Sequence, residues 1–591
     1  MWPMETGSTE TSTTPAGNLA TAATWTAVGL VALFYLCLKS FSCHWQVGDE
    51  NIYLYMAWAF QDHGALPYRD YFFAHPPLHL LPGLPLFSLL GVSPLTARLI
   101  PVSATLAGAL ALFLAARRRG RLGAVVTVFL YLTAFSLVRA STHWTGINLS
   151  VMWACLGLWA LLGGRALAAG VLLALGVGTG NYLLPGAIMA GGLCWLQERR
   201  SLRRYLLGFV PVWLAVQLLG LALGGGGYLE AVYLYHVHKP QAPGSAYRMT
   251  VRVISDNFTL FLLGALAPLL ARLSAGRGAV APANRVSGKK RSGDTAVPWL
   301  ERGRLVLGRL LLAGPAGLAR LGVLWAAGYL LFIFLLPKVF PFYFLLLFPG
   351  LALAGGAGLQ CLYNLLGRLW RGRRERDRSW RRQLAWLAGL LVVSLVLSVL
   401  RLPLQRTLLP GYVRRHDVAM RWSDGLLPGW LNSLFRALWW EDRARAYQEY
   451  AKVTELLFHE SRYFEAAERL ADYVRRHTGP ADTIFGDSST AGLVALLAGR
   501  RLADDCADTN TMRFRSGTTR PTELIARIDG PQLKLVLAAG TLRRGRQGRE
   551  RLRLGKFASL PEFRRWLAEK FQPRYRVRDR TKGWFFLLGR K

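Results

Sequence analysis

The chain has 591 residues, of which 52% are hydrophobic, and its mean hydropathy is positive at +0.25. It is too long and too apolar for a single soluble domain. With 72 Lys and Arg residues against 34 Asp and Glu residues, the formal net charge is +38. Such a charge is typical of nucleic-acid-binding proteins, but the basic residues gather in short segments between apolar runs, and no basic groove interleaved with aromatic residues is visible.

Eleven apolar runs with few charges are each close to the length of about 20 residues that a membrane-spanning helix needs. Residues 1–22 are rich in Thr and Ala and carry acidic rather than basic charge, so they are predicted to be a flexible cytoplasmic N-terminus and not a signal peptide. The predicted spans are residues 23–41, 94–116, 121–138, 147–163, 165–180, 181–197, 205–223, 256–273, 318–336, 341–360 and 383–400.

The distribution of basic residues predicts how these spans are oriented. Four basic segments (117–121, 198–204, 272–304 and 368–382) lie between apolar runs, and placing them in the cytoplasm fixes the side of every other loop without conflict. The segments then expected on the outer side are 42–93, 139–147, 224–255, 337–343 and the tail from 401 onward.

Composition divides the chain into a membrane module and a tail. Residues 23–400 form the predicted transmembrane module, in which 274–303 reads as a flexible cytoplasmic linker. After residue 400, strand-like and helix-like segments alternate, so 401–591 is predicted to be a small extracytoplasmic α/β domain. The fold class predicted is a polytopic α-helical membrane protein of about eleven spans with this domain at its C-terminus.

Two adjacent acids, Asp49 and Glu50, follow the first apolar run. A carboxylate near a membrane is costly unless it is solvated or used, so both are candidate functional residues. The alternative is that the pair caps a helix that starts near Asn51, because acids are favoured at helix N-termini. The two roles are compatible.

Three motifs resemble the GT-C glycosyltransferases, and most closely the superfamily of protein O-mannosyltransferases and lipid A aminoarabinose transferases in its bacterial branch. The first is the acidic pair followed by "YLYMAWAFQDHGALPYRDYFFAHPPL", which is similar to the first outer loop of that superfamily, here residues 42–93. The second is "LPKVFPFYFLLLFPGLALAGG" at 336–356, and the third is the tail segment at 473–501. Together the motifs extend over most of the chain.

The resemblance implies transfer of a sugar from a polyprenyl-phosphate donor to a lipid, glycan or protein acceptor at the outer face of the inner (plasma) membrane. By motif position it assigns the general base to Asp49, with Glu50 as a neighbour that orients the acceptor or tunes the pair. An inverting transfer needs such a carboxylate to take the proton of the attacking acceptor.

The leaving group of this reaction is a lipid phosphate, which requires cations or N–H donors. The superfamily motif places lipid-phosphate contacts at Lys338 and Tyr343, whereas His75 stands where relatives often have Lys. Anchoring at the membrane interface is the simpler explanation for any single cation. Asp and Glu of the superfamily can also assist a divalent cation, but no ligand set is visible and no metal is predicted. The other candidate basic side chains on the outer side are Arg69, Arg139, His143, Lys239, Arg248 and Arg252.

Two other functions fit the sequence. A transporter of lipid-linked sugars would also have many spans, but one broken segment near 176–186 has no counterpart later in the chain, as inverted repeats would require. A non-catalytic assembly protein of envelope polysaccharide synthesis would keep the fold without the chemistry.

Cys43 and Cys506 are both expected outside, where a disulfide is allowed, but the sequence does not pair them.

Overall fold

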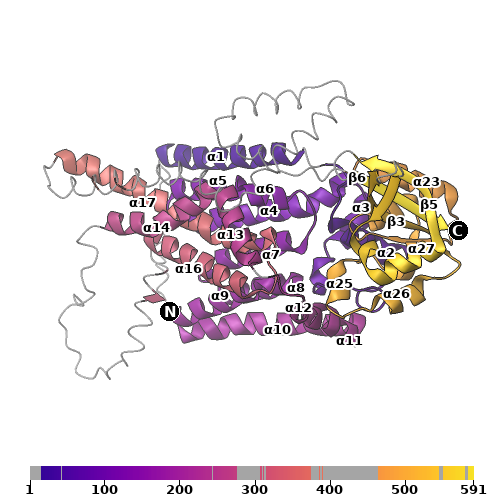
Figure 1. Cartoon of the computed structure of the whole chain (residues 1–591). Coiled ribbons are helices and arrows are strands. Elements are labelled where there is room, and N and C mark those ends of the chain that lie inside the picture. The colour runs from indigo at the N-terminus through magenta and orange to yellow at the C-terminus, as the bar shows by residue number, and fades with distance from the viewer. Residues whose placement is uncertain are drawn as a thin grey trace.

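Apolar runs before residue 375 form a bundle of long helices, and the tail forms a sheet at one end of that bundle (Figure 1). The computed structural model describes residues 15–40, 43–242, 244–275, 307–308, 311, 314–374, 385, 389, 464–544, 550–579 and 583–591. The bundle consists of α1 (Pro15–Ser40), α4 (Pro94–Arg117), α5 (Arg121–Leu132), α6 (Phe135–Ala140), α7 (Gly146–Leu162), α8 (Ala166–Thr179), α9 (Leu184–Gln197), α10 (Arg199–Gly224), α14 (Phe258–Ala275), α16 (Gly314–Leu335) and α17 (Phe348–Arg374).

Within the described residues, five helical segments are long and apolar enough to cross a membrane. A sixth arises if α13 (Ser245–Asp256) and α14 are one span, although they meet at 91°. Of the shorter apolar helices, α5 has 12 residues because the predicted span 121–138 is interrupted after Leu132. The last predicted span, 383–400, lies almost wholly outside the described residues, so the count of eleven stays a prediction.

Close backbone contact joins the last two helices of the bundle. A side chain at Gly322 of α16 would strike the carbonyl oxygen of Gly350 in α17, and one at Gly350 would strike the carbonyl oxygen of Gly322. Small residues at such crossings let apolar helices approach without a gap, which is how helices associate where water cannot drive them together. The abundance of glycine in the sequence therefore has a direct packing role here.

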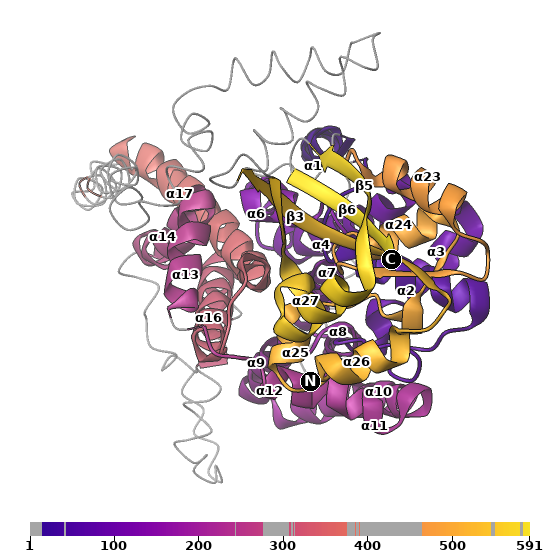
Figure 2. The ribbon, with the colours of Figure 1, turned by 45° about the vertical axis from the view of Figure 1, so that its right-hand side comes forward.

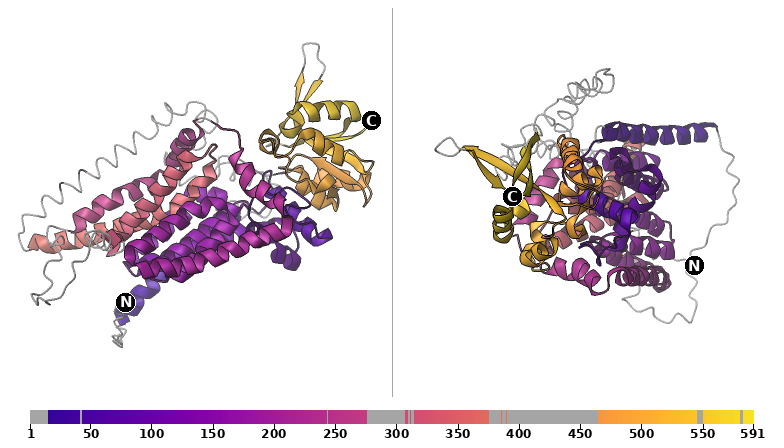
Figure 3. Two further views of the ribbon diagram at one scale, coloured as in Figure 1. Left: turned by 90° about the horizontal axis from the view of Figure 1, so that it is seen from below. Right: turned by 90° about the vertical axis from the view of Figure 1, so that its right-hand side faces the viewer.

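The described parts of the segments expected on the outer side gather at the end of the bundle that carries the sheet (Figures 1 and 3). The carbonyl of Pro337 accepts the Ala242 N–H at 2.9 Å, which joins two of these loops, and the Gly48 N–H donates to the Ser489 carbonyl at 3.1 Å, which joins the first loop to the tail. At the opposite end, the Arg368 guanidinium donates to the Ser274 carbonyl. The predicted grouping of loops is thus present; which side of a membrane each end faces stays a prediction.

The first outer loop contains α2 (Glu50–His63), a short 3-10 turn η1 (Pro77–His79) and α3 (Gly83–Leu90). The aromatic and Pro-rich composition predicts helices lying on the membrane surface. Helices are present, but α2 is enclosed instead: nine of its 14 residues are buried. It is covered by α24 (Ala491–Ala498), a helix of the tail. The sequence could not show this, because the covering helix lies more than 400 residues further along the chain.

The tail is a three-layer α/β unit (Figure 2). Its sheet has the order β2-β1-β3-β6-β5, with β4 paired to β3; β1 runs parallel to β2 and β3, and the other pairs are antiparallel. The strands are β1 (Thr483–Gly486), β2 (Arg501–Leu502), β3 (Leu533–Arg544), β4 (Glu550–Leu554), β5 (Phe571–Asp579) and β6 (Gly583–Arg590). Its other helices are α23 (Ala467–His477), α25 (Thr511–Arg515), α26 (Pro521–Ile528) and α27 (Pro561–Lys570).

Alternating side chains of β3 supply the two cores of this unit. Leu535 and Leu537 face α23 and α24, in a core continuous with α2, whereas Val536 and Ala538 belong to the core on the side of α26 and α27. Successive residues of a strand point to opposite faces, so one short apolar run can serve both layers. The α/β prediction for the tail is confirmed over the described residues from 464 onward.

A glycine sets the distance between α24 and α2. A Cβ atom at Gly492 would lie 2.5 Å from the carbonyl oxygen of Asn51, so a side chain there would push the two helices apart. We expect Gly492→Ala to destabilise the docked tail by about 1–3 kcal/mol, the range for overpacking, even though Ala is the better helix former. Limited proteolysis and thermal unfolding of the purified protein measure this.

Gly530 provides the matched control, because a Cβ atom there meets nothing within 4 Å. Gly530→Ala should leave both measurements unchanged. Equal proteolytic resistance of the two variants would contradict the close approach of α24 to α2.

Candidate active site

Asp49 stands immediately before α2, at the junction of the bundle and the tail. Its backbone occupies the N-cap position of α2, but its exposed side chain makes no capping hydrogen bond. The backbone beside it is fixed by the hydrogen bond from Gly48 to Ser489. The capping explanation that the sequence allowed therefore does not account for this carboxylate, and an exposed carboxylate on a fixed backbone is suited to accept a proton from a substrate.

Glu50 has different surroundings from its neighbour. Its carboxylate and the Arg98 guanidinium are each 2% exposed and form a two-pronged ion pair, with Arg98 Nη2 donating to Glu50 Oε2 at 2.8 Å. The Trp144 backbone N–H donates to the same carboxylate at 2.6 Å. A buried carboxylate needs such partners to stay charged. Glu50 thus ties α2 to α4, and the structure does not direct its carboxylate toward the acceptor role that the sequence suggested.

A cluster of cationic and imidazole side chains lies in the second outer loop. Lys239 Nζ donates to His236 Nδ1 at 2.9 Å, and His236 Nε2 lies 2.8 Å from the Ala74 carbonyl oxygen. Burial, together with the Lys239 charge, lowers the pKa of His236 to about 4, so this imidazole is neutral near pH 7, with its proton on Nε2. Burial also lowers the pKa of Lys239 to about 8, with Asp508 opposing the shift and Lys338 adding to it.

Lys338, where the resemblance places a lipid-phosphate contact, comes from the turn between α16 and the 3-10 segment η4 (Pro341–Leu347). Its ammonium group lies 5.1 Å from the ring centroid of Phe340 and 3.4 Å from the sulfur of Met512, a residue of the tail. It is close enough to Lys239 to lower the pKa of that amine. Tyr343 lies in η4, with its ring centroid 6.0 Å from that of Tyr182.

His75 joins this region through Tyr53 of α2. The two side chains are hydrogen-bonded, with His75 Nε2 at 3.0 Å from the Tyr53 hydroxyl, and the His75 ring stacks on His79 at 4.5 Å between centroids. Burial, then the nearby His79, His236 and Lys239, holds the pKa of His75 well below its usual range. His75 is therefore a neutral hydrogen-bonding group, unlike the Lys that relatives often have at this position.

Asp508, in the tail, is a site residue that the sequence reading missed. Its Oδ1 accepts the Asn510 N–H at 2.9 Å, and its main-chain carbonyl accepts Arg513 Nη1 at 2.8 Å. Burial raises the pKa of Asp508, with Arg513 opposing this, Asp49 adding to it and Lys239 opposing it. Asp508 therefore shares its electrostatic surroundings with Asp49 and Lys239. Three acids within the five residues 504–508 were a signal that could have drawn attention to it.

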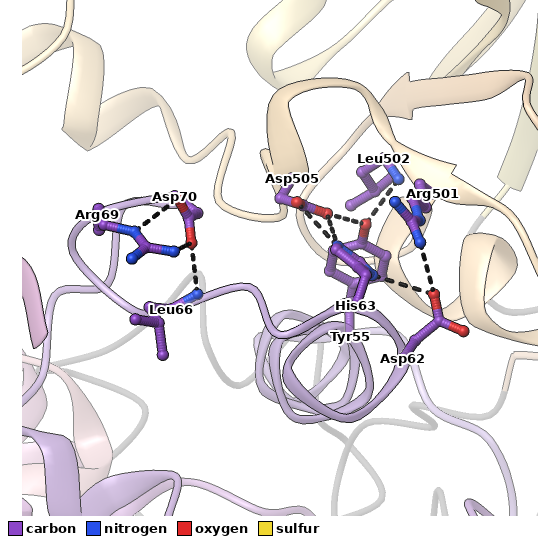
Figure 4. Close-up of polar contacts among 9 residues, drawn as sticks. All are labelled: Tyr55, Asp62, His63, Leu66, Arg69, Asp70, Arg501, Leu502 and Asp505. Atoms are coloured by element: carbon purple, nitrogen blue, oxygen red, sulfur yellow. Dashed lines mark hydrogen bonds and ion pairs between the residues drawn. The ribbon is translucent and has the colours of Figure 1, made fainter.

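Polar contacts along α2, at Tyr55 and His63, fasten the tail to that helix (Figure 4). The Tyr55 hydroxyl donates to Asp505 Oδ1 at 2.6 Å and accepts the Leu502 N–H at 2.7 Å. His63 Nε2 lies 3.0 Å from Asp505 Oδ2. These contacts place the 504–508 segment beside the first outer loop, which is why an acid of the tail reaches the surroundings of Asp49.

Three other residues predicted for the site are Arg69, His143 and Arg248. Arg69 is mostly exposed and pairs with Asp70 at 2.9 Å. His143 Nδ1 lies 3.3 Å from the Thr142 hydroxyl, and Arg248 is exposed on α13.

The outer cysteines are not joined in this structure. Cys43 is exposed and Cys506 is buried, and no disulfide links them. The Cys506 sulfur instead lies 3.4 Å from Arg513 Nη1. Among the residues that the structure describes, no three His, Cys, Asp or Glu side chains are grouped closely enough to hold a metal ion.

The different surroundings of the two adjacent acids can be tested by their effects on stability. Glu50→Gln removes the charge opposite Arg98 and leaves a buried guanidinium unpaired, so we expect it to lower the free energy of unfolding by about 3–5 kcal/mol. Asp49→Asn keeps the side-chain shape at an exposed position and should change that free energy by less than about 0.5 kcal/mol. Denaturant unfolding in detergent measures both.

A double variant, Glu50→Met with Arg98→Met, is the control for this experiment. It removes both charges and should be more stable than Glu50→Gln, since well-packed apolar pairs replace buried ion pairs with little loss. Unfolding of Glu50→Gln at the wild-type denaturant concentration would show that the pair is not buried as described.

Comparisons with known proteins identify solved structures with a similar fold. No family model matches the sequence, and no curated protein is significantly similar to it. Two crystal structures of ArnT from Cupriavidus metallidurans are similar, each with a TM-score of 0.55 and 17% identity. The structure bound to undecaprenyl phosphate matches over 95% of this chain and 97% of its own, and the apo structure over 96% and 98%. The chain is thus a multi-pass membrane protein with the fold of ArnT, as the GT-C resemblance predicted.

Proposed function

We propose that this protein is a glycosyltransferase that moves a sugar from a polyprenyl-phosphate donor to an acceptor at the outer face of the inner membrane. One observation carries the proposal: the fold brings the exposed Asp49 and a cluster of outer-loop cations into one electrostatic neighbourhood. A carboxylate and cations are the two elements that this chemistry requires. The similar fold of ArnT, crystallised with undecaprenyl phosphate, supports a lipid-phosphate donor.

Asp49 is the proposed general base. The acceptor hydroxyl or amine attacks the anomeric carbon and gives its proton to Asp49 as the bond from that carbon to the phosphate oxygen breaks. The exposed position of Asp49 suits contact with an incoming acceptor, and the fixed backbone of the α2 N-terminus suits a defined angle of attack. Asp508 is the neighbouring acid whose raised pKa reflects the charge of Asp49 among other causes.

The cationic groups are proposed to bind the phosphate that leaves with the lipid. Lys239 and Lys338 supply positive charge, while the neutral imidazole of His75 and the hydroxyl of Tyr343 supply hydrogen bonds. Clustered lysines repel one another when the site is empty, which contributes to the low pKa of Lys239, and a bound phosphate relieves that repulsion. The same lysines would hold the negative charge that develops on the phosphate as the sugar departs.

The arrangement of loops supports an outward-facing site. The candidate active site, the first outer loop and the described part of the tail lie at the end of the bundle away from the basic segments 117–121 and 198–204, which the positive-inside rule assigns to the cytoplasm (Figure 3). The donor sugar and the acceptor would then meet on the extracytoplasmic side. A transporter and a non-catalytic assembly protein make a different prediction, since neither needs a proton acceptor at position 49.

Replacing Asp49 tests the base directly. Asp49→Asn preserves shape but cannot accept the proton, so transfer should fall about a hundredfold or more, the usual contribution of a general base. The assay follows sugar release from a panel of polyprenyl-phosphate sugars by protein in lipid nanodiscs, with envelope extract as the source of acceptors. Asp62→Asn, at the other end of α2 on a partly exposed side chain, should keep wild-type turnover. Equal turnover of Asp49→Asn and wild type would refute the assignment.

Binding of the lipid phosphate should depend on pH through Lys239. Because its pKa is lowered to about 8, this amine is charged below about pH 8 and neutral above it. We expect affinity for undecaprenyl phosphate to fall as pH rises through this value, by about tenfold per pH unit at most. Lys239→Arg stays protonated and should remove the inflection, whereas Lys534→Arg, at an exposed side chain of β3, should retain it. An unchanged inflection in Lys239→Arg would exclude this lysine as its source.

A further inference from the structure

A cleft of about 250 Å³ opens between the first outer loop and the tail, separate from the groups assigned above to the donor phosphate. One wall is the segment from Tyr68 to Phe72, a second is formed by residues 227–231 beside α10, and the third is the tail from Asp504 to Arg527. Most of the lining is polar. Because two separately folded parts of the chain form it, this cleft exists only while the tail is docked on the bundle.

The charges in the cleft nearly balance, with three arginines against the four acids Asp70, Glu230, Asp504 and Glu523. Arg69 pairs with Asp70, as Figure 4 shows, and Arg527 pairs with Asp504 at 3.0 Å. Arg513 is fixed by donating from Nε to the Thr519 hydroxyl at 2.9 Å. With one acid in excess, the site has no net positive charge with which to select an anionic ligand. Its planar guanidinium and carboxylate groups instead offer many directed hydrogen bonds to a neutral, hydroxyl-rich ligand.

Tyr71 supplies an independent indication of a ligand. Its side chain lines the cleft and is 5% exposed, yet its hydroxyl has no hydrogen-bond partner among the described residues. A buried hydroxyl without a partner costs about 1–3 kcal/mol, so such groups are rare unless something else satisfies them. A ligand hydroxyl in the cleft would do so, and the neighbouring ring of Phe72 offers an apolar face of the kind that packs against a sugar ring.

The cleft shares a wall with the candidate active site. The Arg513 guanidinium lies over the Phe72 ring at 4.6 Å, and the Phe72 ring meets Tyr235 edge to face at 5.2 Å. Arg513 also holds the Asp508 carbonyl, and the charges of Asp508 and Asp49 act on the pKa of Tyr235. Arg513 and Phe72 therefore connect the cleft to Asp508 and Tyr235 of the candidate active site.

We propose that this cleft binds a saccharide portion of the acceptor, remote from the group that receives the sugar. The inference rests on the proposed function for calling the occupant an acceptor, but the binding itself does not depend on turnover. The binding residues would be Tyr71, Arg69 and Arg527, with Phe72 as the stacking surface.

The test measures saccharide binding to the full-length protein in nanodiscs by saturation-transfer NMR and calorimetry. The probes are chitotetraose, maltotetraose and a hyaluronan tetrasaccharide, with a Gly-Ser-Thr peptide as the comparison. Tyr71→Phe removes only the unpartnered hydroxyl, so it should fold normally and weaken binding about five- to tenfold, as loss of one buried hydrogen bond predicts. Arg527→Met, at a half-exposed position, should weaken binding to a similar degree.

Two controls separate this inference from the proposed function. Tyr473→Phe, on α23 and outside the cleft, should bind the probe as the wild type does. Asp49→Asn should also bind normally although it cannot catalyse transfer. If Asp49→Asn keeps turnover but the cleft variants lose saccharide, the base assignment fails and the cleft assignment stands. No binding of any probe, equal binding by wild type and Tyr71→Phe, or cleft-dependent binding of the peptide in place of the saccharides would overturn the proposal.

Discussion

The outer end of this protein depends on how the N-terminus of α2 is held from two sides. From the tail, the Ser489 carbonyl accepts the Gly48 N–H at 3.1 Å and the Asn51 side-chain amide at 2.5 Å. From the bundle, Arg98 holds Glu50 in a buried ion pair. Asp49 lies between these attachments, so its position is determined by contacts that its own side chain does not make. If either attachment were lost, Asp49 would still be present, but its carboxylate would no longer be held at this position.

This arrangement explains why the two adjacent acids differ in their surroundings. Successive residues at the start of a helix point about 100° apart, so one acid can face the protein interior while its neighbour faces outward. Glu50 uses its charge to anchor the helix, and Asp49 is left on the exposed side. The sequence indicated that the pair was unusual, but only the burial of each side chain distinguishes the structural acid from the candidate base.

The sequence predicted what local pattern and charge determine. Apolar runs located most of the bundle helices, basic segments predicted which loops lie together, and alternating patterns located β1, β3, β5 and β6 of the tail. It did not predict the burial of α2 or the position of Asp508 near Asp49, because both depend on docking of the tail. It also did not predict the neutral state of His75, which depends on burial and on the nearby His79, His236 and Lys239. The order of the helices and strands could be predicted from the sequence, but the charge states and contacts of the site residues could not.

The docking of the tail also has a consequence for how the protein is made. Ser489, Asp505 and Asp508 are synthesised after every helix of the bundle, and the acid at position 49 emerges near the beginning. The bundle can therefore enter the membrane with its outer end unfinished, and the site gains its second acid and its covering helix only when the last part of the chain has folded against the first loop. A truncated or stalled chain would hold the early motif in full and still lack the finished site.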